Sequence, residues 1–162
     1  MDSIIKTITN SLNFMPAELL IFFISLMPIL ELRGGLIAAS ILGVDWRIAF
    51  PICVIGNMLP IPFILLFINK IFAFLKKTKF HKMIDALESR DQKKGENLSK
   101  YKDLGLFGLV AIPLPGTGGW TGALVAALLR LGTKKSTFII ALGVITAGII
   151  MSLLSYVIPN LI

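Results

Sequence analysis

Short apolar runs alternate with glycine-rich interruptions along this chain. The first run, residues 17–30, contains only Glu18 and Ser25 as polar members. Glu31-Leu-Arg-Gly-Gly35 interrupts it, and a second apolar run follows over residues 36–44. A helix needs about 20 apolar residues to span the hydrocarbon core of a bilayer. The pattern therefore predicts a re-entrant hairpin, which dips into the membrane and returns to the side it entered from.

The second half of the chain has the same organisation. Residues 104–114 form an apolar arm, residues 115–119 a glycine-rich tip, and residues 120–131 a returning arm. An ungapped shift of 87 residues pairs identical residues of the two halves: Pro28 with Pro115, Gly35 with Gly122, Ala39 with Ala126, Leu42 with Leu129 and Gly56 with Gly143. Together with the shared order of elements, these pairs indicate an internal repeat.

Each predicted hairpin precedes a run that is long enough to cross a membrane. Residues 47–69 and 136–158 are each 23 residues long and carry no internal charge. Pro60 and Pro62 remove two backbone donors from the first run, so we expect a kink there. Asn57 lies just before this kink and needs a hydrogen-bond partner within the protein or in a wet cavity.

Two further segments have a different pattern. Residues 2–14 place apolar side chains at helical spacing opposite polar ones, which predicts an interfacial helix that ends at Pro16. Residues 70–103 are polar and basic. Apolar positions within 75–87 predict a partly amphipathic helix there, and residues 91–102 are predicted to be a loop.

The distribution of charge indicates an integral membrane protein. The chain of 162 residues is 56% apolar, with a mean hydropathy of +0.86 and a net charge of +7. Of its 25 charged side chains, 15 lie between Lys70 and Asp103, which leaves the flanking regions almost free of charge. Nucleic-acid binding would require a basic face on a folded support, so we expect no nucleic-acid partner.

The number of crossings in each repeat determines the predicted topology. One hairpin plus one crossing ends on the side opposite to its start, so tandem repeats must insert in opposite orientations, as in secondary transporters. The positive-inside rule then places residues 70–103, with Arg130, Lys134 and Lys135, in the cytoplasm and both termini outside. The charge rule leaves one alternative open, in which each hairpin is a pair of short full spans.

The expected fold is therefore an all-α protein of the cytoplasmic membrane with a single membrane domain. Its expected parts are an interfacial helix (1–15), a first repeat (16–69), a basic cytoplasmic loop (70–103) and an inverted second repeat (104–162). Each repeat is a re-entrant helical hairpin followed by a transmembrane helix. A homodimer is a further expectation for so small a protomer, although no motif specifies it.

The first glycine-rich tip carries charge. Glu31 and Arg33 are two residues apart and would share no helix face, but in an unwound tip they flank one site. Ionisable residues at membrane depth are functional candidates. We assign anion binding to Arg33, whose planar fork suits phosphate or carboxylate, with Gly34 and Gly35 beside it, and proton or cation coupling to Glu31. The structural alternative is an ion pair at the headgroup level.

The second tip carries backbone donors instead of charge. The amides of Gly116, Thr117, Gly118 and Gly119 precede a predicted helix and can form an anion-binding nest. Trp120 is a further candidate contact, as Asn57 is for the first half. The alternative is a tight tip in which only glycine fits between neighbouring helices.

The sequence indicates no catalytic set. The only histidine, His81, lies in the polar segment, and Glu18 and Glu31 are the only carboxylates within the apolar regions. The single cysteine, Cys53, has no partner for an internal disulfide and is expected to be a small buried residue. We expect no enzymatic activity, no cofactor and no metal site.

Three motifs resemble those of the small multidrug export protein family, which is thought to be distantly related to the DedA/SNARE-associated membrane proteins. They are Glu31-Leu-Arg-Gly-Gly35, Asn57-Met-Leu-Pro-Ile-Pro62 and Ala111-Ile-Pro-Leu-Pro-Gly-Thr-Gly-Gly-Trp-Thr-Gly122. The resemblance covers roughly residues 15–158 and implies two facing re-entrant hairpins and transport activity. Ile37 departs from the family's usual proline. The DedA relatives, for which undecaprenyl-phosphate translocation is implied, carry arginines at the second hairpin, and this chain has none.

Taken together, these features predict a transporter that moves a small or lipid-linked solute, anionic or amphipathic, through a site between the two tips with proton or cation coupling. The expected partners are the lipid bilayer, the solute and the coupling ion. One alternative is a scramblase or flippase for phospholipid or an undecaprenyl-phosphate-like lipid. A second alternative is a membrane structural or assembly factor that transports nothing.

Overall fold

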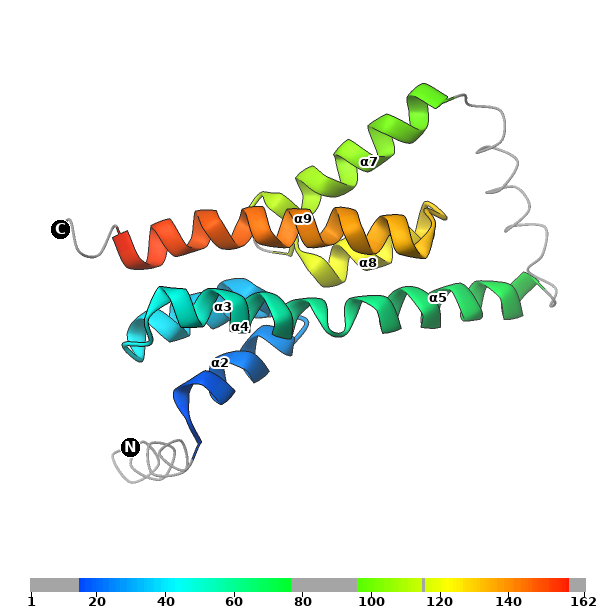
Figure 1. Cartoon of the computed structure of the whole chain (residues 1–162). Coiled ribbons are helices and arrows are strands. Elements are labelled where there is room, and N and C mark those ends of the chain that lie inside the picture. Colours follow the sequence, from blue (N-terminus) through cyan, green and yellow to red (C-terminus); the bar gives the residue numbers. More distant parts are fainter. Residues whose placement is uncertain (1–14, 77–95, 115, 158–162) are drawn as a thin grey trace. The chain divides into compact units, whose positions relative to one another are not determined.

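The computed structural model describes residues 15–76, 96–114 and 116–157, and the regular elements in these ranges are all helices (Figure 1). The predicted interfacial helix of residues 2–14 lies outside the described residues. The helices are α2 (Ala17–Leu26), α3 (Glu31–Ile41), α4 (Trp46–Met58), α5 (Ile61–Lys76), α7 (Glu96–Ala111), α8 (Gly119–Leu128), α9 (Thr133–Ser152) and the π-helical turn η1 (Leu153–Val157). The predicted all-α class is confirmed.

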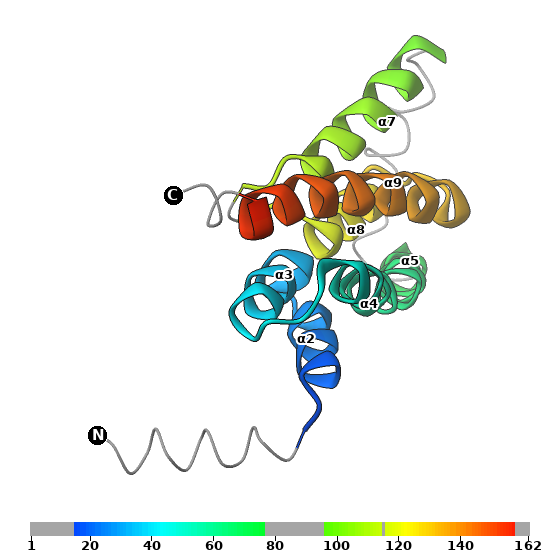
Figure 2. The ribbon, with the colours of Figure 1, turned by 60° about the vertical axis from the view of Figure 1, so that its left-hand side comes forward.

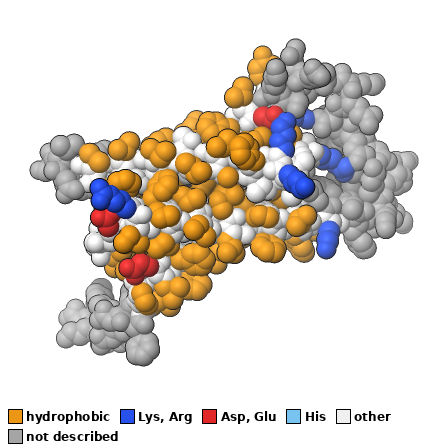
Figure 3. Space-filling view, viewed as in Figure 1, with side chains coloured by type: hydrophobic (Ala, Val, Ile, Leu, Met, Phe, Trp, Pro, Cys, Tyr) orange, Lys and Arg blue, Asp and Glu red, His pale blue; other side chains and the backbone are white. Residues whose placement is uncertain are grey.

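Two helical stretches have the length and composition to cross a membrane. They are Trp46–Ile68, of 23 residues, and Thr133–Val157, of 25 residues, and they coincide with the two predicted spans. Only 28% and 39% of their apolar windows are buried within the structure. Their apolar side chains therefore face mainly outward, as Figure 3 shows for one face of the molecule. A lipid environment accounts for this surface better than water does.

The first of these stretches contains the predicted kink. Helix α4 ends at Met58 and α5 begins at Ile61, with Leu59 and Pro60 forming a turn between them. Proline has no backbone N–H and clashes with the preceding turn, which explains the interruption. The helix resumes at once, because the Ile64 amide donates to the Pro60 carbonyl at 2.9 Å.

The first hairpin turns earlier than the sequence predicted. Residues 31–35 were expected to form an unwound tip, and this expectation is wrong, because Glu31 is the first residue of α3. The turn lies over residues 27–30 instead. Backbone hydrogen bonds connect this turn to the new helix: Glu31 N to Met27 O at 3.0 Å and Gly34 N to Leu30 O at 2.8 Å.

The described part of the polar segment is more helical than predicted. Helix α5 continues to Lys76, and α7 begins at Glu96, so the predicted loop over residues 91–102 is wrong from Glu96 onward. No proline lies between Glu96 and the apolar arm that starts at Leu104. Extension of an existing helix costs little free energy, so the helix of the apolar arm continues toward the N-terminus through the polar residues as far as Glu96.

The chain forms two compact units. The first contains α2, α3, α4 and the C-terminal end of α9 with η1. Helices α2 and α3 lie side by side as a hairpin (Figure 2). A Cβ on Gly35 of α3 would overlap Ser25 Oγ of α2 and lie 2.8 Å from Cys53 Sγ of α4. A Cβ on Gly56 of α4 would lie 2.8 Å from the Phe22 carbonyl oxygen. Small residues thus allow the three helices to approach closely.

The C-terminal end of α9 also packs within the first unit. A Cβ on Gly148 would lie 2.8 Å from the ring of Phe50 and 3.4 Å from Leu32. Two side chains then bond to backbone: Ser40 Oγ donates to Ser155 O at 2.7 Å, and Tyr156 OH donates to Val44 O at 2.9 Å. These bonds attach η1 to the end of α3.

The second unit contains α5, α7, α8 and most of α9. Helix α8 packs against both α5 and α7. A Cβ on Gly122 of α8 would lie 2.5 Å from Val110 Cγ2 of α7 and 3.5 Å from Ile140 of α9. A Cβ on Gly143 of α9 would lie 2.7 Å from the Cβ of the same Val110 and 3.3 Å from the Phe107 carbonyl oxygen.

The packing inside the two units follows one scheme. The neighbours of corresponding glycines also correspond. Around Gly35 they are Ser25, Cys53 and Ile21, and around Gly122 they are Val110, Ile140 and Leu106, in the same order. Around Gly56 they are Phe22 O and Ser25, and around Gly143 they are Phe107 O and Val110. Residues of α3 and α4 correspond to residues of α8 and α9 that lie 87 positions later in the chain. Residues of α2 correspond to residues of α7 that lie 85 positions later, because the turn between α7 and α8 is longer than the turn between α2 and α3.

The ends of the two return helices match in the same way. Gly43 and Arg130 both have positive φ, +72° and +52°. The same backbone bond closes each turn: Val44 N to Ala39 O at 2.9 Å and Leu131 N to Ala126 O at 3.0 Å. This is the geometry of a helix end that closes through a left-handed residue, which normally selects glycine.

Candidate functional site

The candidate site in the first hairpin centres on a buried carboxylate. Glu31 is 5% exposed, and its neighbour Leu32 is 1% exposed. The backbone of Glu31 is left-handed, with φ of +51°. Such a conformation in a non-glycine residue costs about 1–3 kcal/mol and is concentrated at functional sites. An ionisable side chain is therefore both buried and held in a strained backbone at the hairpin turn.

Arg33 lies two residues further along the first turn of α3. Its side chain is half-buried, and its guanidinium interacts electrostatically with Glu31. The two partners differ in burial, since Glu31 is buried and Arg33 is only partly buried. A partly accessible cation beside a buried anion is suited to exchange its contacts with an incoming anionic group.

The two glycines that follow have a packing role in this hairpin. A Cβ on Gly34 would lie 2.7 Å from Leu30 Cβ, and the Gly34 amide already donates to the Leu30 carbonyl. Gly35 is buried where α3 meets Ser25 of α2. Close packing against the turn explains Gly34 and close helix contact explains Gly35, and their role as substrate ligands stays a prediction.

The second tip is held by hydrogen bonds of its own threonines. Thr117 Oγ1 is 2.9 Å from the carbonyl oxygens of Ile112 and Leu114, to which it donates. Thr121 Oγ1 donates to the Gly116 carbonyl at 3.0 Å, and Gly116 has a φ of +80°. The Thr117 hydroxyl proton is thus used within the tip.

Helix α8 begins directly after this tip. Gly118 is its N-cap, with a φ of +152° that favours glycine, and both Gly118 and Gly119 are buried. The first amides of an α-helix point out of its N-terminus, where the helix dipole favours an anion. The backbone is consistent with the predicted nest, and anion binding there stays a prediction.

Asn57 is buried at the end of α4. It is 2% exposed, and its Oδ1 has no hydrogen-bond partner within the described part of the chain. A buried amide oxygen without a donor costs about 1–3 kcal/mol. This residue was predicted to need a partner or a wet cavity, and its proposed helper role is still untested.

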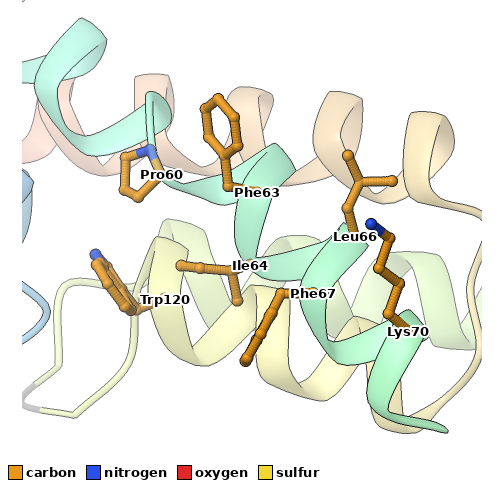
Figure 4. Close-up of a pocket in the computed structure, with 7 residues that line it drawn as sticks. All are labelled: Pro60, Phe63, Ile64, Leu66, Phe67, Lys70 and Trp120. Atoms are coloured by element: carbon orange, nitrogen blue, oxygen red, sulfur yellow. The ribbon is translucent and has the colours of Figure 1, made fainter. Parts of the chain in front are cut away.

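The second unit also contains a groove between α5 and α8 that the sequence did not reveal. It has a volume of about 560 Å³ and is lined by Pro60, Phe63, Ile64, Leu66, Phe67, Lys70 and Trp120 (Figure 4). Lys70 is the only charged residue among them. Spacing of three or four between Pro60, Ile64 and Phe67 is the signal that could have identified this helix face.

Residues that could hold a metal ion do not cluster in the described ranges. No group of three or more His, Cys, Asp or Glu side chains occurs there. Cys53 is fully buried against Gly35, as expected of a small packing residue.

These features define a class of protein: an integral membrane protein with two long apolar helices, short helical hairpins and a buried charge in one of them. The model of one family, described as "Putative small multi-drug export protein", matches residues 31–150. The match covers well over half of the chain, so the chain belongs to this family. Searches of curated proteins and of solved structures gave no match.

Proposed function

We propose that this protein is an exporter that moves a small anionic or amphipathic solute across the cytoplasmic membrane, with Arg33 binding the solute and Glu31 coupling it to protons. Membership of a small multidrug export family supports export as the general activity. The observation that carries the assignment of residues is the burial of Glu31, at 5% exposure, beside a partly accessible Arg33.

Helix lengths support a re-entrant first hairpin. Helices α2 and α3 have 10 and 11 residues, which is about 15–17 Å each. The hydrocarbon core is about 30 Å thick, so neither helix alone would cross it. A hairpin of this length would place Glu31 and Arg33 near the middle of the bilayer, where charge is retained mainly for function.

The matching contacts inside the two units support an internal repeat. In our proposal each repeat is a hairpin followed by a crossing helix, and the two repeats have opposite orientations in the membrane. The basic segment 70–103 would then be cytoplasmic. That Arg33 and the glycine-rich second tip contribute to one site stays a prediction, and crosslinking of cysteines placed at positions 33 and 117 would test it.

Transport can be tested in proteoliposomes with an imposed pH gradient. The probe is the anionic amphiphile anilinonaphthalene sulfonate, whose accumulation is followed by fluorescence. We expect gradient-dependent uptake by the wild type and a loss of about tenfold or more in Arg33→Lys, because a point charge does not replace the guanidinium fork. Arg47→Lys, which changes an exposed arginine of the same unit, is the matched control and should transport normally.

The proposed coupling role of Glu31 is tested separately in the same proteoliposome assay. Glu31→Gln should retain binding of the probe but lose its dependence on the pH gradient, since no proton can be exchanged at position 31. Full gradient-driven transport by a double variant, Arg33→Ala with Glu31→Gln, would refute both roles. Gradient-independent mixing of labelled lipids, without uptake of the probe, would favour the scramblase.

A further inference from the structure

The groove between α5 and α8 has an apolar wall and a single cation at one end. In Figure 4, Pro60 and Trp120 lie at one end of the groove and Lys70 at the other. Phe63, Ile64 and Phe67 form the wall between them. An elongated apolar surface that ends in one positive charge is complementary to an amphiphile with an apolar chain and an anionic head.

The length of the groove corresponds to one leaflet. Pro60 and Lys70 are ten residues apart, which is about 15 Å along a helix. This is half of the hydrocarbon thickness of about 30 Å. Lys70 lies two residues after the end of the apolar stretch at Ile68 and is the first charged residue after Arg47. It therefore marks the level of the headgroups, where lysine side chains extend to the interface.

The deep end of the groove lies at the N-terminal ends of α5 and α8. Pro60 belongs to the break between α4 and α5, and Trp120 is the second residue of α8. At this point the chain has turns rather than a continuous helical wall. A lipid chain that runs down the groove from the headgroup level would therefore end against the ring of Trp120.

We propose that this groove binds one anionic phospholipid of the leaflet at the Lys70 end of α5, with its phosphate at Lys70 and one acyl chain along Phe63 and Phe67 to Trp120. This lipid site goes beyond the proposed export function and does not depend on it. The positive charge selects the anionic headgroup, and the groove selects a chain rather than a soluble anion, which would leave the apolar wall uncovered.

Fluorescence quenching by brominated lipids tests the site. The chain has two tryptophans, so a Trp46→Phe background leaves Trp120 as the only reporter. The protein is reconstituted in two matched bilayers. One contains a minor fraction of phosphatidylglycerol, brominated near the chain ends, in unlabelled phosphatidylcholine. The other contains the same fraction of brominated phosphatidylcholine in unlabelled phosphatidylglycerol.

The site predicts stronger quenching of Trp120 by the dilute anionic lipid. One lysine near an anionic headgroup contributes about 1 kcal/mol, so we expect about a fivefold preference for phosphatidylglycerol. Lys70→Gln should abolish the preference, and Lys70→Arg should keep it. Lys134→Gln removes another exposed lysine, on α9, and should leave the preference unchanged.

Variants of the wall test the position of the chain. Ile64→Phe adds volume beside Trp120 and should reduce quenching by both lipids. Phe67→Ala should also reduce quenching by both lipids, whereas Phe138→Ala should not, although both phenylalanines are 66% exposed. Equal quenching by both dilute lipids in the Trp46→Phe protein would overturn the proposal. So would a preference that survives Lys70→Gln, or one that Lys134→Gln abolishes equally.

Discussion

Gly122 lies against Val110 so closely that a Cβ at position 122 would be 2.5 Å from Val110 Cγ2. The other atoms near that position, on Ile140 and Leu106, are at 3.5 Å and 3.7 Å. A single methyl group of α7 therefore determines whether α8 can carry a side chain at this point. In the first unit, Gly35 has the same relationship with Ser25.

The first prediction follows from this single contact. Gly122→Ala should destabilise the protein by about 1–3 kcal/mol through overpacking. Val110→Ala removes the offending methyl, so the double variant should be more stable than the sum of the two single effects by about 1 kcal/mol or more. Thermal unfolding in mild detergent gives the stabilities of the wild type, the two single variants and the double variant. Gly105→Ala is the control, because a Cβ there meets nothing within 4 Å, and its effect should simply add to that of Val110→Ala.

Gly56 gives a contrasting prediction. A Cβ at this position would lie 2.8 Å from the carbonyl oxygen of Phe22, which belongs to the backbone of α2. Gly56→Ala should therefore lower stability by about 1–3 kcal/mol. Shortening of the neighbouring side chain in Phe22→Ala should give no rescue, since the carbonyl remains. Recovery of the melting temperature in that double variant would show that the close contact has been assigned to the wrong atom.

The third prediction concerns the left-handed residues that end the two return helices. Gly43→Ala should cost about 1 kcal/mol, because alanine is strained at a φ of +72°. For Arg130, with a φ of +52°, the informative pair is Arg130→Gly and Arg130→Ala. Both variants lose the guanidinium, so the difference between their stabilities reports the strain of the backbone. The Arg130→Gly protein should be more stable than the Arg130→Ala protein by about 1 kcal/mol. Equal stabilities would mean that position 130 is not left-handed in the membrane.

An ion pair links α7 and α9 within the second unit. Lys135 Nζ is 2.5 Å from Asp103 Oδ2, but the lysine side chain is 51% exposed and the aspartate side chain 22%. Exposed pairs contribute little, so a double-mutant cycle with Lys135→Ala and Asp103→Ala should give a coupling of less than about 1 kcal/mol. Raised salt should reduce it further. A coupling of several kcal/mol would place the pair in a much drier environment than this exposure implies.

The sequence was sufficient for the long elements of the fold. The two apolar stretches were found at their correct places because length and the absence of charge are sufficient signals for a spanning helix. Pro60 marked the interruption between α4 and α5 for the same local reason, namely its missing donor. The short apolar arms also became helices, as α2, α3, α7 and α8.

Other features depend on packing that a single sequence does not display. The turn of the first hairpin lies before Glu31, because the chain accepts a left-handed glutamate rather than turning at the two glycines. Gly34 is then packed against Leu30 of the turn, and Gly35 against Ser25 of α2. The ungapped shift of 87 residues also missed the match between Phe22 and Phe107, because the longer second turn changes the shift to 85.

The groove residues were missed for a related reason. Lys70 was grouped with the polar segment that follows it, whereas α5 continues through it and places it beside Phe67. Trp120 was predicted only as a candidate ligand contact, and the α5 residues that line the groove with it are 50–60 positions away in the chain. Such long-range juxtapositions are set by helix packing, which a pattern of apolar residues does not specify.

The most direct test of the central claim is cysteine labelling from each side of the membrane. In a Cys53→Ala background, single cysteines at Met15 and Trp46 flank the first hairpin, and those at Tyr101 and Gly132 flank the second. A membrane-impermeant maleimide should label the first pair only from outside and the second pair only from the cytoplasmic side, because each hairpin returns to the side it entered from. If the two members of either pair are labelled from opposite sides, that hairpin crosses the membrane and the inverted-repeat account is wrong.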